Sequence, residues 1–377
     1  MFKKIAVSLI MLIVVFTILA KFTAIPADFA ADSQSYQLLQ AGDLSVSIEE
    51  LTLVDELREV ADPIVEGQTL PRSIDLRIWY PKQPSEKAMP LVLYSHGMMG
   101  NYDEGAHYAE HFVSHGYIFV APNFPLTNFS NGQKADAVDV VNQPADISFI
   151  LDEILRRNND PQDALYQRID NDKIIAMGLS LGGMTTHMLG YDPVRMDKRV
   201  DALVAIAAPS VMFTQKYLST RELPYLAIAS PQDVFIDYPT NALPLLQKIN
   251  RAALVTIDGG SHTGFANQAR WLRWLDNPDS IGCSQVKKNL DATIEDGDSW
   301  YHKLGSIEDG YIVEVDVEIC DAQLENAMNP IRQNDFTLLA AWSFLQCQFA
   351  EQAESYCEFL IEGISRENAA VSYQDNF

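Results

Sequence analysis

The chain has 377 residues, 47% of them hydrophobic, so it can bury a large core and is not expected to be disordered. Its formal charge of −24 at pH 7 argues against nucleic acid or an anionic membrane surface as its main partner, because both would repel it. We expect this charge to serve solubility.

Residues 1–31 are predicted to be a signal peptide or an N-terminal membrane anchor. Lys3 and Lys4 precede an uncharged, mostly apolar run from Ile5 to Ala20. No clean A-x-A cleavage site follows, so both alternatives stay open. In either case the positively charged N-terminal end, with Lys3 and Lys4, is expected to stay on the cytoplasmic side of the membrane. The rest of the chain is therefore predicted to be exported to the periplasm, the medium or the outer face of the cytoplasmic membrane.

Residues 32–278 are predicted to form the core of an α/β fold, after a flexible polar link at 31–40. Alternating or continuous apolar runs predict strands at 44–53, 72–80, 90–95 and 117–120. Apolar residues at helical spacing predict helices at 108–114 and 137–157.

One strand-to-helix turn carries the strongest signal for chemistry. An apolar strand from Ile174 ends in Gly178-Leu179-Ser180-Leu181-Gly182, which matches G-x-S-x-G, and a helix-like stretch follows. Such a sharp turn holds its serine in strained torsions and exposes the hydroxyl, and side chains at the glycine positions would collide with the strand and helix. Ser180 is therefore the predicted nucleophile, and the Leu181 N–H is predicted to face an oxyanion.

Downstream of this turn, strands are predicted at 201–207, 225–229 and 252–257, and helices at 267–275 and 336–349. Strands that alternate with helices predict a mostly parallel, doubly wound sheet. Ligand sites in such sheets lie at the carboxyl ends of the strands.

A serine nucleophile needs a histidine as base within hydrogen-bond reach. Beyond the helix-like stretch that follows Ser180, two histidines are available, His262 and His302. His262 lies in a glycine-rich loop directly after the strand 252–257 and is the predicted base. His302 lies in an acidic segment and is expected at the surface.

The base needs an acid that orients it. Asp233 follows the strand 225–229 almost directly and is the favoured acid. Asp237 and Asp258 are the alternatives, because a loop aspartate is often only a turn residue.

The second oxyanion donor is predicted in the loop after the strand 90–95. This loop reads His96-Gly97-Met98, and Gly97 would let the backbone approach an acyl oxygen closely. The Met98 N–H is the predicted donor, and His96 is expected to brace the loop.

A competing motif, H-x-x-E-H, spans His107 to His111 and would suit zinc. Zinc would need a third ligand, which the sequence does not identify, and the motif falls in a predicted surface helix. We therefore expect no metal and no other cofactor.

Four cysteines lie in the last quarter of the chain, at Cys283, Cys320, Cys347 and Cys357. An even number in an exported protein predicts disulfides. Three pairings are open, and the most local one joins Cys283 to Cys320 and Cys347 to Cys357. The first pair brackets most of 279–325, a predicted acidic insertion with a strand-like stretch at 310–319. Residues 326–377 are predicted as a helical part that completes the core.

The assembled pattern resembles exported α/β-hydrolases of the platelet-activating-factor acetylhydrolase type, and is similar to dienelactone-hydrolase-like and cutinase-like esterases. The resemblance covers about residues 70–275. It rests on the following stretches: Arg77-Ile78-Trp79-Tyr80-Pro81, Pro90 to Gly97, His115-Gly116-Tyr117, Gly178 to Gly183, Asp233 and Gly260-Ser261-His262. The dienelactone enzymes proper have a cysteine at the position of Ser180, so that substrate is not expected.

This resemblance implies an α/β-hydrolase fold with a C-terminal insertion, and it implies the roles already assigned to Ser180, Asp233, His262, Met98 and Leu181. The implied function is a serine carboxylic-ester hydrolase that forms an acyl-enzyme on a small-molecule or lipid ester. Short-acyl esters such as acetylated phospholipids come first, and a cutinase-like or lipolytic activity is the alternative. An inactive hydrolase fold used as a binding module is the alternative from another class. The oligomeric state stays open.

Overall fold

The computed structural model describes residues 11, 15–16, 25–61, 67–84, 87–293, 303–312 and 319–377. Most of the predicted leader, and His302, lie outside these residues. Within the described ranges, no helix combines the length and the apolar character that crossing a bilayer requires.

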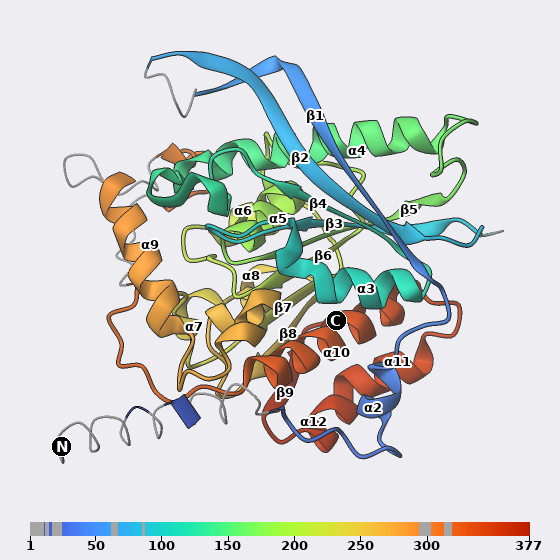
Figure 1. Ribbon diagram of the computed structural model, residues 1–377, viewed down its shortest axis with the longest axis vertical. Coiled ribbons are helices and arrows are strands. Elements are labelled where there is room, and N and C mark those ends of the chain that lie inside the picture. The colour runs from blue at the N-terminus through green and yellow to red at the C-terminus, as the bar shows by residue number, and fades with distance from the viewer. Residues whose placement is uncertain are drawn as a thin grey trace.

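A nine-stranded sheet runs through the molecule in the order β1-β2-β4-β3-β5-β6-β7-β8-β9 (Figure 1). The six strands from β4 to β8 in this order are parallel to one another, whereas β1 with β2, β2 with β4 and β8 with β9 pair antiparallel. The predicted mostly parallel, doubly wound sheet is thus confirmed. The strands are β1 (Val46–Ala61), β2 (Thr69–Pro81), β3 (Met89–Ser95), β4 (Ile118–Asn123), β5 (Ile169–Leu179), β6 (Ala202–Ile206), β7 (Tyr225–Ala229), β8 (Ala252–Ile257) and β9 (Val371–Asp375).

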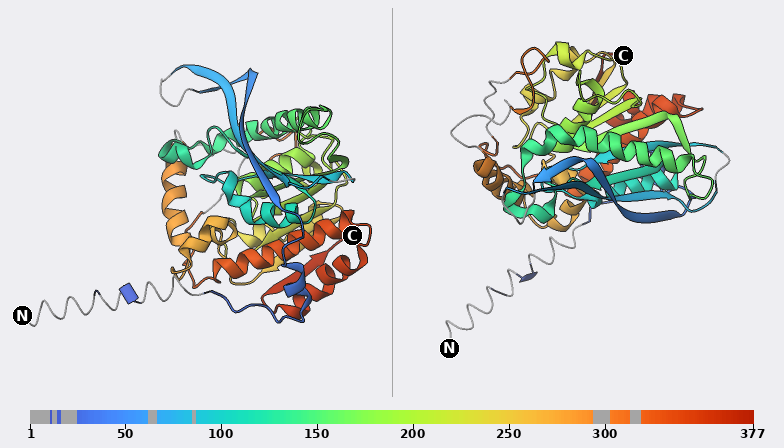
Figure 2. Two further views of the ribbon diagram at one scale, coloured as in Figure 1. Left: turned by 45° about the vertical axis from the view of Figure 1, so that its right-hand side comes forward. Right: turned by 90° about the horizontal axis from the view of Figure 1, so that it is seen from above.

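Helices cover both faces of the sheet, which explains why its central strands are apolar on both sides (Figures 1 and 2). The first face is covered by α4 (Gln143–Asn158), α5 (Leu181–Tyr191), α6 (Gln215–Leu218) and α8 (Leu245–Lys248). The opposite face is covered by α3 (Ala106–Ser114), α10 (Pro330–Phe349), α11 (Glu354–Glu358) and α12 (Ile364–Glu367). Strands β1 and β2 extend beyond these layers as a long ribbon.

Several elements differ from their predicted extent. Helix α10 begins at Pro330, six residues before the predicted start at 336, because the Asn329 side chain caps the Ile331 N–H and proline suits the first helical turn. The predicted helix at 267–275 is a 3₁₀ turn, Asn267–Leu272. The C-terminal part is not only helical, since β9 adds an edge strand to β8.

The segment 31–40 was expected to be a flexible link, and this expectation is wrong. It contains the short helix α2 (Gln34–Leu38), which lies beside α12 (Figure 1). The Glu367 carboxylate accepts hydrogen bonds from the backbone N–H of Gln34 at 3.0 Å and of Ser35 at 2.8 Å. The Ser35 hydroxyl donates to the same carboxylate at 2.7 Å. These contacts fix the segment to the C-terminal part.

The insertion begins with a helix that was not predicted, α9 (Asp279–Thr293). Of the strand-like stretch 310–319, Tyr311 forms an isolated bridge with Phe213, and residues 313–318 lie outside the described part. The cysteines pair as predicted, Cys283 with Cys320 and Cys347 with Cys357.

Candidate active site

The predicted site residues gather at the carboxyl ends of the parallel strands. Strands β3 and β5 are neighbours in the sheet although β4 lies between them in sequence, so the strand order reverses between them. Met98 follows β3 and Ser180 follows β5, on the two sides of this reversal. Asp233 follows β7 and His262 follows β8. Crevices of this kind are where doubly wound folds bind their ligands.

The turn at Ser180 is strained as the motif predicts. Its φ of 56° and ψ of −118° are unfavourable for a residue with a side chain, and α5 begins at the next residue. A Cβ atom at Gly178 would lie 2.2 Å from the Gly182 carbonyl oxygen, and one at Gly182 would lie 2.0 Å from the Ser95 carbonyl oxygen. Only glycine therefore fits at both positions.

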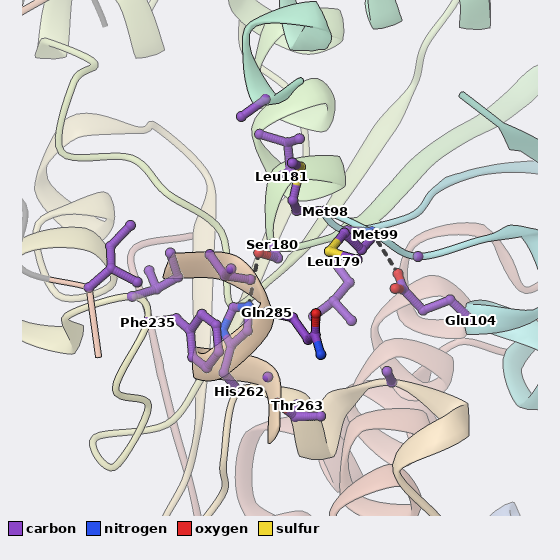
Figure 3. A pocket seen from close by; sticks show the side chains of 18 of the residues that line it. Met98, Met99, Glu104, Leu179, Ser180, Leu181, Phe235, His262, Thr263 and Gln285 are labelled. Atoms are coloured by element: carbon purple, nitrogen blue, oxygen red, sulfur yellow. Dashed lines mark hydrogen bonds between the residues drawn. The ribbon is translucent and has the colours of Figure 1, made fainter. Parts of the chain in front are cut away.

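A line of hydrogen bonds joins the serine, the histidine and the aspartate. The Ser180 Oγ lies 2.9 Å from His262 Nε2 (Figure 3). On the other side of the ring, His262 Nδ1 lies 2.7 Å from Asp233 Oδ2. The other oxygen of Asp233 accepts the N–H groups of Phe235 and Ile236, at 2.8 and 2.9 Å. A proton on Nδ1 faces the carboxylate, so Nε2 is free to accept the serine proton.

Charges around His262 favour its protonated form. Burial alone lowers the pKa of His262, but the carboxylates of Asp233, Asp279 and Glu104 outweigh burial, and the pKa is raised above its ordinary value. The surroundings of His262 thus stabilise the imidazolium form of its side chain.

The other two candidate acids lie away from the histidine. Asp237 is exposed and caps the short helix α7 (Tyr238–Asn241), where its carboxylate accepts the Thr240 N–H at 3.0 Å. Asp258 is exposed at the end of β8. The structure therefore brings Asp233, and neither alternative, to His262.

The two predicted oxyanion donors lie beside the serine. Met98 and Leu181 both line the cavity above Ser180 (Figure 3). In the described part of the chain, neither backbone N–H has a hydrogen-bond acceptor. A Cβ atom at Gly97 would lie 3.3 Å from the Ser180 Cβ, so the glycine allows this close approach.

Two buried side chains hold the loop that carries Met98. His96 Nδ1 lies 2.7 Å from the Gly97 carbonyl oxygen, its Nε2 accepts the Phe124 N–H at 3.0 Å, and burial lowers its pKa to about 4. Glu104 accepts the Gly97 N–H at 2.8 Å, and burial raises its pKa to about 7. Sequence reasoning did not identify Glu104, because nothing in the local pattern separates it from a surface acid.

An apolar cavity of about 450 Å³ opens at Ser180 and His262. Its walls come from the core and from the insertion. Core residues include Met98, Met99, Leu179, Leu181, Val211 and Phe235, and insertion residues include Ile281, Gly282, Gln285, Val286 and Ile319. The predicted insertion therefore contributes a wall of this cavity.

The H-x-x-E-H motif lies on α3, away from the cavity walls. Glu110 is exposed there, whereas the His111 ring packs edge-on against Trp342, with 5.1 Å between the ring centroids. Among the residues that the structure describes, no three metal-ligating side chains come together.

Comparison with known families agrees with the fold. A comparison with curated proteins finds no significant match. A family model described as alpha/beta hydrolase fold matches residues 90–227, a range that contains the Met98 loop and the Ser180 turn and ends before Asp233 and His262. Taken with the nine-stranded sheet and its flanking helices, this match shows that the chain has an α/β-hydrolase fold.

Proposed function

We propose that the protein is a serine carboxylic-ester hydrolase that works through an acyl-enzyme. The observation that carries this proposal is the line of hydrogen bonds from Ser180 through His262 to Asp233, which ends at an apolar cavity. This arrangement provides a nucleophile, a base and an orienting acid in the order that acyl transfer requires.

In the first half of the reaction, Ser180 Oγ attacks the ester carbonyl carbon while its proton passes to His262 Nε2. The carbonyl oxygen becomes an oxyanion, which the N–H groups of Met98 and Leu181 stabilise. The imidazolium then gives its proton to the leaving alkoxide, so an alcohol departs and the acyl group stays on Ser180.

In the second half, water takes the place of the alcohol. His262 removes a proton from the water, and the hydroxide attacks the acyl carbon. The tetrahedral intermediate collapses, the proton returns to Ser180 Oγ, and the carboxylic acid leaves. Asp233 keeps its charge throughout and holds the imidazole in the required tautomer.

The cavity supports an ester with a sizeable apolar part. Its volume of about 450 Å³ lies within the range of about 300–1,000 Å³ that is typical of ligand pockets. An acetyl group alone would leave most of that volume open. The cavity thus favours the lipolytic or cutinase-like alternative, or a short-acyl lipid whose alkyl chain occupies the cavity.

The proposal extends to where the enzyme works. Two disulfides fit a protein that folds in an oxidising compartment. We propose export on this ground together with the charged and apolar pattern of the first 20 residues.

Hydrolysis of p-nitrophenyl esters from acetyl to octanoyl by the full chain tests the proposal. We expect Ser180→Ala to abolish hydrolysis, and we expect the exposed-site control Ser219→Ala to leave it unchanged. Rates should rise with chain length up to the octanoyl ester if the acyl group occupies the cavity. Full activity of Ser180→Ala would exclude the mechanism, and no hydrolysis by the wild type would favour the inactive binding module.

A further inference from the structure

A second carboxylate reaches the base from the insertion. Asp279 is the first residue of α9 and is fully buried. One of its oxygens accepts the His262 backbone N–H at 2.9 Å, and the other accepts the Thr263 backbone N–H at 2.6 Å. Its own N–H donates to the Asn277 side chain at 2.9 Å. Both oxygens of this buried group are thus used on the loop that carries the base.

These bonds fix the backbone from which the imidazole projects. His262 precedes the 3₁₀ turn Thr263–Phe265, whose first N–H groups have no acceptor within the turn. A carboxylate at such a turn start makes charge-assisted hydrogen bonds, which are stronger than bonds between neutral groups. The imidazole also stacks on Phe235, with 4.4 Å between the ring centroids. Asp233 and Phe235, from the loop after β7, and Asp279, from the start of α9, therefore hold the base from two sides of the chain.

The helix that begins at Asp279 is also a wall of the cavity. The same first turn includes Ile281 and Gly282, which line the cavity. A Cβ atom at Gly282 would lie 2.4 Å from the Thr263 Oγ1, so α9 packs directly on the loop that carries His262. The disulfide from Cys283 to Cys320 ties the same turn to the end of the insertion.

We propose that Asp279 is a positioning residue for His262 and that it couples the cavity wall α9 to the base. The proposal rests on the proposed function, because it assigns a role in the reaction of Ser180. The insertion then has two tasks: its apolar side chains contact the substrate, and its first carboxylate orients the group that accepts the serine proton.

The charge of Asp279 gives this role a distinct signature. The charged groups that face His262 are Asp233, Asp279 and Glu104, and all three raise the pKa of the imidazole against the effect of burial. Removal of one negative charge therefore lowers the pKa of His262. The acidic limb of the pH profile of kcat/KM reports protonation of the base in the free enzyme. This limb then moves to lower pH.

The test is Asp279→Asn in the full chain, with Asp237→Asn as the matched control, since Asp237 also caps a helix but does not contact the base. Asparagine keeps the size of the side chain, but removes its charge and one acceptor. We expect kcat to fall roughly 10- to 100-fold, as for a misplaced reacting group. We expect the acidic limb to move to lower pH, and the control to match the wild type in both respects.

The position of the acidic limb does not depend on how much of the variant folds, so a partly unfolded sample still gives an answer. If Asp279→Asn keeps both the wild-type kcat and the wild-type position of the acidic limb in the pH profile of kcat/KM, the proposal is overturned. The NMR titration of the His262 ring, assigned with His262→Gln, measures the same pKa without catalysis. If the wild type hydrolyses no ester but Asp279→Asn still lowers the pKa of His262 in the NMR titration, the proposed function is refuted and the contact between Asp279 and the His262 loop is kept.

Discussion

Asp233→Asn is the substitution that tests the orienting acid. Asp233 is 7% exposed, and its two oxygens have different tasks. Oδ1 accepts the Phe235 and Ile236 N–H groups, and Oδ2 faces His262 Nδ1 at 2.7 Å. In the asparagine variant, the remaining oxygen is needed for the two N–H groups. The amide NH₂ then faces Nδ1.

This geometry forces the wrong tautomer. A donor opposite Nδ1 makes that nitrogen an acceptor, so the imidazole proton moves to Nε2 and points at the Ser180 Oγ. The base can no longer accept the serine proton. The expected loss in kcat is about 10⁴-fold, as in serine hydrolases with this change, which corresponds to about 5.4 kcal/mol of transition-state stabilisation. Rotation of the amide to restore the tautomer would leave buried N–H groups unpaired, at about 1–3 kcal/mol each.

The assay is kcat on p-nitrophenyl butyrate, with the folded state of each variant checked by circular dichroism. Asp237→Asn is the control because its carboxylate is exposed and contacts only its own helix start. It should keep wild-type activity. If Asp233→Asn kept a tenth or more of the activity while Asp237→Asn lost it, the assignment of the acid would be refuted.

Three further predictions follow from the cavity, the turn and the buried histidines. Gly182→Ala places a Cβ atom 2.0 Å from the Ser95 carbonyl oxygen. The free energy of unfolding, measured in urea, should therefore fall by at least about 1–3 kcal/mol, and activity should be lost. A stable, active variant would contradict this. Val211→Phe should lower the rate on octanoyl relative to acetyl esters at least about tenfold by filling the cavity, and an unchanged ratio would speak against the cavity as the acyl site. Burial lowers the pKa of His96 to about 4 and of His187 to about 3, so the unfolded chain binds protons below pH 6.5 that the folded chain does not. Each should therefore remove up to about 1.4 kcal/mol of stability per pH unit as the pH falls from 6.5 toward 4. The raised pKa of Glu104 offsets part of this loss, and urea unfolding that is more difficult at pH 5 than at pH 7 would contradict the prediction.

The sequence was sufficient for the features that depend on neighbouring residues. The Ser180 turn could be predicted because its glycines, its strand and its helix are contiguous, and the structure has the strained torsions that this pattern requires. The central strands could be predicted because burial on both faces produces continuous apolar runs.

Features that depend on distant contacts could not be predicted. The sequence favoured Asp233 over Asp237 only by its position nearer the strand end, and the contact with His262, which depends on β8, is what separates the two turn aspartates. Helix α9 has a weak apolar pattern because its inner side borders an open cavity instead of a packed core. Strand β9 is a short edge strand with one buried residue, so its pattern is weak. Asp279 acts on a loop 17 residues upstream, a contact that no local pattern reports.

The central claim is that Ser180 is the nucleophile of a serine hydrolase, and covalent labelling tests it most directly. The full chain is incubated with a serine-reactive fluorophosphonate, and the adduct is located by mass spectrometry of its peptides. We predict a single adduct on Ser180, its absence in Ser180→Ala, and much slower labelling of His262→Gln, because the base activates the hydroxyl. An adduct on another serine, or none on a folded wild type, would contradict the account.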